Sequence, residues 1–206
     1  MKTWLRESWQ RLQRWGCLLL LIPYGLTTER PLIQADIQRW AELLNYGTAP
    51  LVRQLLQLLS QMPEFRNLYY HRLSQGNLLA RVSLWGLRPL YPGCGTLFID
   101  QSCTIGPGLF LQHAFSTIIM ADIGENCWIN QQVTIGYRDR TGRPHLGNGV
   151  RITAGAKVIG NVSLGDNVTV GANAVVVKNV PADCVVVGVP AHIIRREGRK
   201  VQEELV

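Results

Sequence analysis

A six-residue repeat in the second half of the chain constrains the fold more than any other feature of the sequence. Large aliphatic residues stand at every sixth position in two runs: Ile99, Ile105, Leu111, Ile123, Ile129 and Ile135, then Leu146, Ile152, Val158, Leu164, Val170 and Val176. Only Thr117 breaks the first run. An α-helix turns every 3.6 residues and cannot keep such a repeat on one face. A parallel β-helix can, because each six residues make one short strand and one corner.

The corners of this repeat carry small residues. A small or apolar residue stands four positions after most aliphatic points: Cys103, Leu109, Cys127, Val133, Val150, Ala156, Val162, Val168 and Ala174. Glycine often follows the aliphatic point directly, as at Gly106, Gly124, Gly136, Gly147, Gly165 and Gly171. We expect glycine and asparagine, including Asn126, Asn148 and Asn167, to supply the positive φ of tight corners.

A polar loop interrupts the repeat once. Ile135 and Leu146 are eleven residues apart instead of six, and the additional residues fall within GYRDRTGRPH, residues 136–145. Loops that leave a regular scaffold often carry its function. We therefore expect functional side chains in this loop.

The first part of the chain has a helical pattern instead. Apolar residues at helical spacing predict helices over about 3–15, 29–44, 50–62, 65–73 and 78–90. The sequence thus predicts an α+β chain with three parts. These are an N-terminal helical region (1–95), a β-helix of hexapeptide repeats (96–191) and a C-terminal tail (192–206).

The composition limits the classes of binding partner and the cellular compartment that the sequence suggests. The net charge is +7, and residues 1–95 hold most of the excess, with 11 Lys/Arg against 5 Asp/Glu. No zinc-finger spacing, RNA-binding signature or basic region with heptads accompanies it, which argues against nucleic acid. The five cysteines have no paired spacing and predict reduced thiols in the cytoplasm. Residues 16–26 resemble a secretion signal only loosely, because the apolar run is short and no cleavage pattern follows.

Four stretches carry a family likeness: FIDQSCTIGPGLFLQH (98–113), VTIG (133–136), GAKVIGNVSLGDNVTVGANAVVVKNVP (155–181) and GVPAHII (188–194). They resemble the serine acetyltransferase family, which are left-handed β-helix enzymes that use acetyl-CoA. The resemblance covers residues 96–196. It implies transfer of acetyl from acetyl-CoA to L-serine, a step of cysteine biosynthesis. It also implies a homotrimer with active sites between subunits and no metal.

The resemblance implies the catalytic residues. His113 matches the family's general base, and Asp100 matches the aspartate that orients this base. An imidazole has an ordinary pKa near 6.5 and can remove a hydroxyl proton at neutral pH. A carboxylate on the other ring nitrogen would fix the tautomer. Taken alone, a histidine in an apolar run is more often a core residue whose ring bonds a carbonyl group.

The resemblance also implies a binding groove for CoA. Small residues let the pantetheine arm approach the backbone, and cations pair with the phosphates. The matching positions are Gly136, Ala154, Gly155 and Ala172 for the arm, and Arg151, Lys157 and Arg196 for the phosphates. The coils need small residues in any case, and a solvated terminus explains Arg196 equally well.

The acceptor side departs from the family pattern. Gln112 stands where serine-acetylating members have aspartate, and GRPH (142–145) stands where they have R-H-P. Alignment on Pro144 puts Arg143 in the place of the histidine and leaves His145 two residues late, whereas alignment on Arg143 inserts the proline. Arg143 can hold a carboxylate bidentately, but the neutral Gln112 suits a sugar hydroxyl at least as well. A sugar or exopolysaccharide precursor is therefore the alternative acceptor.

Two functions of other classes are alternatives to acyl transfer. A three-histidine zinc site is disfavoured, because only His113 and His145 of the four histidines lie where they can reach one. A hexapeptide scaffold without activity is the remaining alternative, against which the pair of Asp100 and His113 argues.

The two ends of the chain suggest partners. Trp4, Trp9 and Trp15, among several basic residues, are compatible with a membrane surface, but packing on the domain or a neighbouring subunit is favoured. Family members bind a sulfhydrylase through a C-terminus that ends in Ile. This chain ends in Val206, which keeps a sulfhydrylase as a candidate partner.

Overall fold

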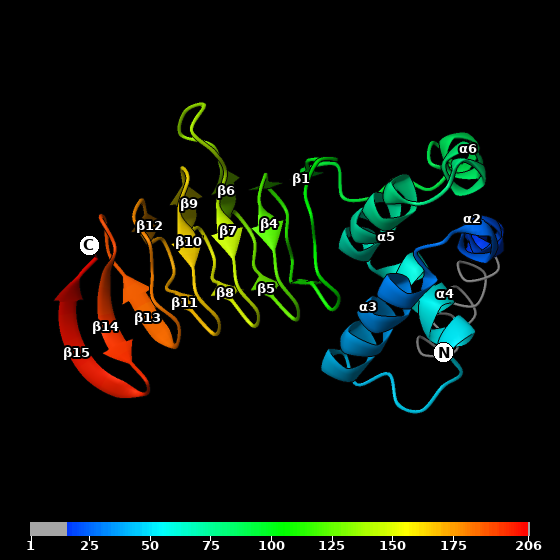
Figure 1. The fold of residues 1–206 in the computed structure, drawn as a ribbon. Helices are drawn as coiled ribbons and strands as arrows, with labels where there is room; N and C mark the ends of the chain where they lie inside the picture. The colour runs from blue at the N-terminus through cyan, green and yellow to red at the C-terminus, as the bar shows by residue number, and fades with distance from the viewer. Residues whose placement is uncertain (1–15, 206) are drawn as a thin grey trace. The chain divides into compact units, whose positions relative to one another are not determined.

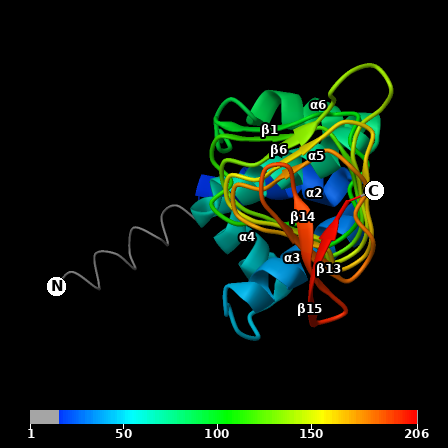
Figure 2. The same ribbon diagram turned by 90° about the vertical axis from the view of Figure 1, so that its left-hand side faces the viewer.

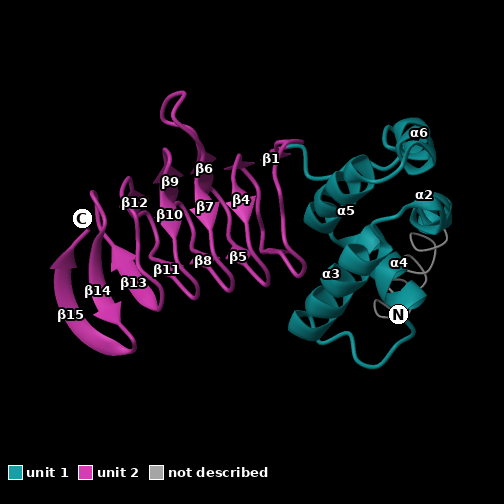
Figure 3. Ribbon diagram, in the orientation of Figure 1, with its two compact units in different colours: residues 1–95 teal, residues 96–206 magenta. Residues whose placement is uncertain are grey.

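The protein consists of two compact units, residues 1–95 and 96–206 (Figures 1 and 3). The structure is a computed structural model that describes residues 16–205. The helix predicted over residues 3–15 lies outside the described residues, as does Val206.

The described part of unit 1 is helical, as the sequence predicts. It contains a 3-10 helix, η1 (Cys17–Leu20), and five α-helices: α2 (Leu21–Leu26), α3 (Arg30–Leu43), α4 (Leu51–Gln61), α5 (Pro63–Gln75) and α6 (Leu78–Leu87). Its core is built around Trp40, which meets Phe65 edge to face at 5.2 Å between ring centroids. None of the described helices is long and apolar enough to cross a membrane.

Unit 2 is a left-handed parallel β-helix with three faces (Figure 1). Face A stacks β1 (Leu97–Ile99), β3 (Thr117–Ile119), β6 (Thr134–Gly136), β9 (Lys157–Ile159) and β12 (Val175–Val176). Face B stacks β4 (Asp122–Ile123), β7 (His145–Leu146) and β10 (Ser163–Leu164). Face C begins with β2 (Phe110–Leu111), β5 (Trp128–Ile129), β8 (Arg151–Ile152), β11 (Thr169–Val170) and β13 (Cys184–Val187).

The chain runs from face A to B to C and then into the next coil. Two of the three edges of the prism matter below. The AB edge comprises residues 100–103, 120–121, 137–144, 160–162 and 177–179, and the CA edge comprises 112–116, 130–133, 153–156 and 171–174. The insertion loop, residues 137–144, belongs to the AB edge and protrudes from it (Figures 1 and 2).

The hexapeptide repeat places its aliphatic residues in the core. Every aliphatic point of the two runs is buried except Ile99 in the first coil, which is half-buried. Thr117, the exception to the repeat, is buried as well. Its hydroxyl donates to the carbonyl of Phe115 at 3.2 Å, which satisfies the polar group within the core.

The glycines that follow the aliphatic points serve a purpose other than the predicted one. Gly106, Gly124, Gly147 and Gly165 do not adopt positive φ. A Cβ on Gly124 would lie 2.7 Å from the backbone carbon of Gly147 in the next coil, and the other three meet the same obstacle. These glycines are therefore required by the close stacking of coils.

Positive φ occurs at other corner positions. Asn126 and Asn167 adopt it, at 56° and 59°, as predicted. The prediction for Asn148 is wrong, because Gly149 takes that conformation at 65°. The side chain of Asn148 instead accepts a hydrogen bond from the backbone N–H of Glu125 at 2.8 Å and so links two coils.

The C-terminal segment, for which the sequence predicts only a tail, is ordered. Strands β14 (His192–Arg196) and β15 (Arg199–Glu204) pair antiparallel and extend face C beyond β13. Glu197 and Gly198 join them with φ of 48° and 78°. Two positive φ values in a two-residue connection are typical of a type I′ hairpin.

We expect Gly124→Ala to lower the free energy of unfolding by about 1–3 kcal/mol, the usual cost of overpacking a closely packed site. Gly136→Ala is the matched control, because its Cβ would find its nearest neighbour, Met120 Cβ, at an ordinary 3.7 Å. Urea unfolding of both variants checks this. Equal midpoints for the two variants would contradict the role of glycine in coil stacking.

Candidate functional site

Most of the predicted site residues fall on two different edges of the β-helix. His113, Gln112, Ala154, Gly155 and Ala172 lie along the CA edge. The other group comprises Asp100 and Arg143 on the AB edge, with Gly136 and His145 at the ends of the strands that meet there.

His113 is exposed at a strained corner. It is the second residue after β2 and has a φ of 49°, which is uncommon for a residue with a side chain. Its carbonyl accepts a hydrogen bond from Phe115 N–H at 2.7 Å, and Ala114 between them is fully buried. The corner thus anchors its backbone and presents the imidazole to solvent. Strain of this kind, where the surrounding structure holds it, is found at functional sites.

The structure does not bring Asp100 and His113 together within one chain. Asp100 follows the last residue of β1, whereas His113 precedes the first residue of β3. Because β1 and β3 pair in register, the length of a face A strand separates the two corners, roughly 10 Å at about 3.3 Å per residue. The carboxylate of Asp100 instead accepts hydrogen bonds from the Ser102 backbone N–H at 2.9 Å and hydroxyl at 2.5 Å.

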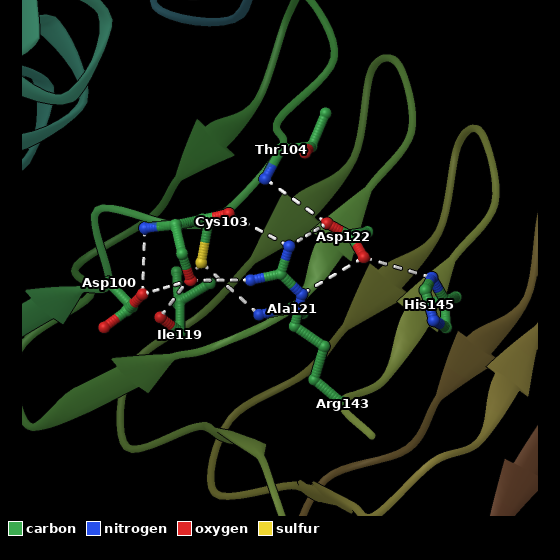
Figure 4. A network of polar contacts seen from close by, with 9 residues as sticks. Asp100, Cys103, Thr104, Ile119, Ala121, Asp122, Arg143 and His145 are labelled. Atoms are coloured by element: carbon green, nitrogen blue, oxygen red, sulfur yellow. Dashed lines mark hydrogen bonds and ion pairs between the residues drawn. The ribbon is translucent and has the colours of Figure 1, made fainter. Parts of the chain in front are cut away.

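Asp122, a residue that the sequence analysis missed, joins Arg143 and His145 (Figure 4). Arg143 donates from Nε to Asp122 Oδ2 at 3.1 Å and from Nη2 to Oδ1 at 2.5 Å. The same guanidinium donates from Nη1 to the hydroxyl of Ser102 at 2.8 Å and from Nη2 to its carbonyl at 2.9 Å. Nδ1 of His145 lies 3.2 Å from Asp122 Oδ2. All three nitrogens of the guanidinium are therefore engaged.

The spacing of the repeat contained a signal for Asp122. It stands directly before the aliphatic point Ile123, as His145 stands before Leu146, and such positions face outward. Adjacent coils then place the two side by side, and they are register partners in β4 and β7. The eleven-residue interval obscured this equivalence.

Charge in the Asp122 cluster is balanced locally. Burial alone would raise the pKa of Asp122, but the hydrogen bonds and positive charge of Arg143 outweigh it and hold that pKa below its ordinary value. Hydrogen bonding to Asp122 in turn raises the pKa of Arg143. The Arg143 side chain is only 18% exposed, against 54% for His145. His145 is therefore the member of the cluster that faces solvent.

Gln112 presents one end of its amide to the protein. Its Oε1 accepts hydrogen bonds from Trp128 Nε1 at 3.1 Å and Asn130 Nδ2 at 3.2 Å. The NH₂ group is the other end of this side chain and can only donate. Beside His113, Gln112 thus offers a neutral donor where an acidic side chain would offer an acceptor.

Only some of the residues matched to CoA binding lie close together. Ala154, Gly155 and Ala172 form a narrow track of small residues on the CA edge, and Lys157 begins β9 beside it. Lys157 donates to the carbonyl of Gln132 at 2.6 Å on the same edge. Gly155 has a φ of 74°, and a Cβ there would overlap the side chain of Asn173.

The other three predicted CoA positions lie elsewhere. Arg151 stacks on the Trp128 ring at 4.7 Å on face C. Arg196 pairs with Glu203 within the C-terminal hairpin, beside Cys184 at the opposite end of β13 from the CA edge. Gly136 ends β6 and is buried. Within residues 16–205 there is no group of three or more His, Cys, Asp or Glu side chains that could hold a metal ion.

Comparison with known proteins places the β-helix in context. Residues 143–178 match the family described as bacterial transferase hexapeptide (six repeats). A serine acetyltransferase of Synechococcus elongatus is 36% identical over 162 residues, covering 74% of this chain and 65% of the relative. One from Staphylococcus xylosus is 42% identical over 108 residues, half of each chain. The chain thus spans only half to about two thirds of the length of these curated relatives.

Solved structures show the same likeness in three dimensions. The serine acetyltransferase of Neisseria gonorrhoeae superposes with a TM-score of 0.65 at 27% identity, covering 84% of this chain and 68% of that one. A serine acetyltransferase in complex with CoA gives 0.62 at 25% identity, covering 81% and 70%. In sequence and in fold, this chain is a hexapeptide-repeat protein related to the serine acetyltransferases, as its motifs predict.

Proposed function

We propose that this protein is an acetyl-CoA-dependent O-acetyltransferase with L-serine as the first acceptor to test. The observation that carries the proposal is the exposed imidazole of His113, held at a positive-φ corner on the same edge as the track of small residues. The names of its relatives, and the neighbour in complex with CoA, support the choice of co-substrate and acceptor. As in those relatives, the product would be O-acetylserine, a precursor of cysteine.

His113 would act as the general base. It removes the proton of the acceptor hydroxyl as the oxygen attacks the thioester carbonyl of acetyl-CoA. The new C–O bond forms, the C–S bond breaks, and CoA leaves as its thiol after taking the proton back from the imidazolium. The reaction needs no metal in this scheme, because the imidazole supplies all the proton transfer.

The CoA groove would follow the CA edge. Ala154, Gly155 and Ala172 leave the backbone accessible to the pantetheine arm. Lys157 stands beside this track, and Arg151 lies one strand away, so both are placed to meet phosphates. Arg196 and Gly136 lie away from this edge and have no role in this proposed groove.

A complete site would need two protomers. Within one chain, His113 and the track of small residues share one edge, while Asp100, Arg143 and His145 gather at the other. In a homotrimer around a threefold axis, the CA edge of one subunit would face the AB edge of the next. Asp100 would then orient His113 across the interface. A cytoplasmic location fits the five cysteines, none of which forms a disulfide bond within the described residues.

The alternative acceptor is a sugar hydroxyl, and the ion pair of Arg143 favours it. The guanidinium of Arg143 already donates two hydrogen bonds to Asp122, so it is no longer available to bind the carboxylate of an amino acid. Gln112 offers a neutral donor where an ammonium group would need an acid. A polysaccharide precursor would need neither charged partner.

We expect His113→Ala to reduce serine-dependent release of CoA from acetyl-CoA by at least about 100-fold, the usual contribution of a general base. His192→Ala is the control, because His192 lies on β14, outside the CA edge. Thiol release is measured with and without L-serine. Release with a sugar acceptor but not with serine would favour the alternative, and release unaffected by either variant would refute His113 as the base. No release with any acceptor would favour a non-catalytic scaffold.

Mixed oligomers test whether the site spans two protomers. His113→Ala and Asp100→Asn are each expected to be nearly inactive, but co-expression should restore about a quarter of wild-type activity, because random mixing gives one interface in four with both intact residues. Co-expression of His113→Ala with His113→Gln is the control and should restore nothing. Absence of recovery in the first mixture would contradict an interface site, and an active Asp100→Asn variant would remove Asp100 from the mechanism.

A further inference from the structure

We propose that Asp122 is a positioning residue on the acceptor side of the site. Its carboxylate pairs with Arg143 and so fixes the insertion loop, an arrangement called the clasp below. The same carboxylate orients His145 so that Nε2 faces the acceptor. The proposal rests on the acetyltransferase function above and deepens it. It changes the role of Arg143 from a substrate ligand to a structural clasp.

The clasp is visible in the bonds of the guanidinium (Figure 4). Arg143 lies at the returning end of the insertion loop, and its partners Asp122 and Ser102 come from the two preceding coils. One side chain thereby ties three successive turns of the chain together. With its side chain only 18% exposed and each nitrogen bonded, Arg143 has little left to offer a ligand.

The orientation of His145 follows from the chemistry of its partner. An ionised carboxylate can only accept hydrogen bonds, so Asp122 favours a hydrogen on the imidazole nitrogen that lies 3.2 Å from it. That nitrogen is Nδ1. In the neutral imidazole, Nε2 is then the acceptor, which is the atom able to receive a hydrogen bond from an acceptor hydroxyl or ammonium group. The His145 side chain as a whole is 54% exposed.

The insertion loop contains a matched control. Asp139 is also a carboxylate beside an arginine, Arg138, and accepts hydrogen bonds from Thr141 N–H at 2.8 Å and Arg138 Nε at 3.1 Å. The hydrogen bonds of Asp139 stay within the exposed part of the loop and involve neither Arg143 nor His145. Asp139→Asn therefore removes a loop carboxylate without touching the proposed clasp.

Steady-state kinetics give the first test. Asp122→Asn should raise KM for the acceptor by about tenfold or more, the scale of one charge-assisted hydrogen bond, while KM for acetyl-CoA stays within about twofold. Asp139→Asn should change neither constant, and Asp122→Glu should recover part of the loss. An equal rise in both KM values, or the same effect from Asp139→Asn, would overturn the proposal.

A double-mutant cycle separates positioning from general stabilisation. If Asp122 acts through His145, then His145→Gln and Asp122→Asn together should cost no more than His145→Gln alone. Additive losses would show that Asp122 does not act through His145.

The tautomer of His145 gives a readout that does not depend on activity. In ¹⁵N-labelled wild-type protein at about pH 8.5, where an ordinary imidazole is neutral, His145 should carry its proton on Nδ1. Its signal is assigned as the one that disappears in His145→Gln. Asp122→Asn should shift the proton toward Nε2, and Asp139→Asn should not. An unchanged tautomer in Asp122→Asn refutes the proposal, whereas the expected tautomers in a protein that releases no CoA would refute only the proposed function.

Discussion

The stacking of one coil on the next is the interaction on which the rest of the structure depends. Each coil of unit 2 pairs in register with its neighbours, and its aliphatic points fill a continuous core. The stacking distance is close enough that a single Cβ on Gly106, Gly124, Gly147 or Gly165 would strike the next coil. Because such a scaffold has little freedom to move, its edges hold side chains at fixed separations.

Function is therefore expected where the repeat is broken or its corner is strained. His113 stands at a corner whose φ is unusual for a side chain of its size, and the insertion loop is the longest interruption of the six-residue repeat. The two features lie on different edges of the same prism. That separation is the physical reason to propose an active site shared between subunits.

Periodicity made the architecture predictable. The six-residue spacing identified the buried positions of unit 2, and helical spacing identified α3, α4, α5 and α6 of unit 1 but missed η1 and α2. The reason for the glycines was not predictable, because it depends on the distance to the next coil. The hairpin of β14 and β15 was missed because a Glu-Gly turn is a weaker hairpin signal than Asn-Gly or Asp-Gly.

The candidate site was harder to predict from the sequence than the architecture. A sequence likeness assigned Asp100 to His113, but only the strand register shows that a face of the β-helix separates them within one chain. Arg143 was assigned to a substrate carboxylate because its partner Asp122, 21 residues earlier, was not recognised. In both cases the missing information was which residues of successive coils lie side by side.

A crystal structure of the assembled protein with CoA would test the central claim most directly. We expect a cyclic oligomer in which the CoA thiol lies within hydrogen-bond reach of His113 from one protomer, with the insertion loop of the next protomer beside it. CoA bound away from the CA edge, or a site completed within a single chain, would contradict it.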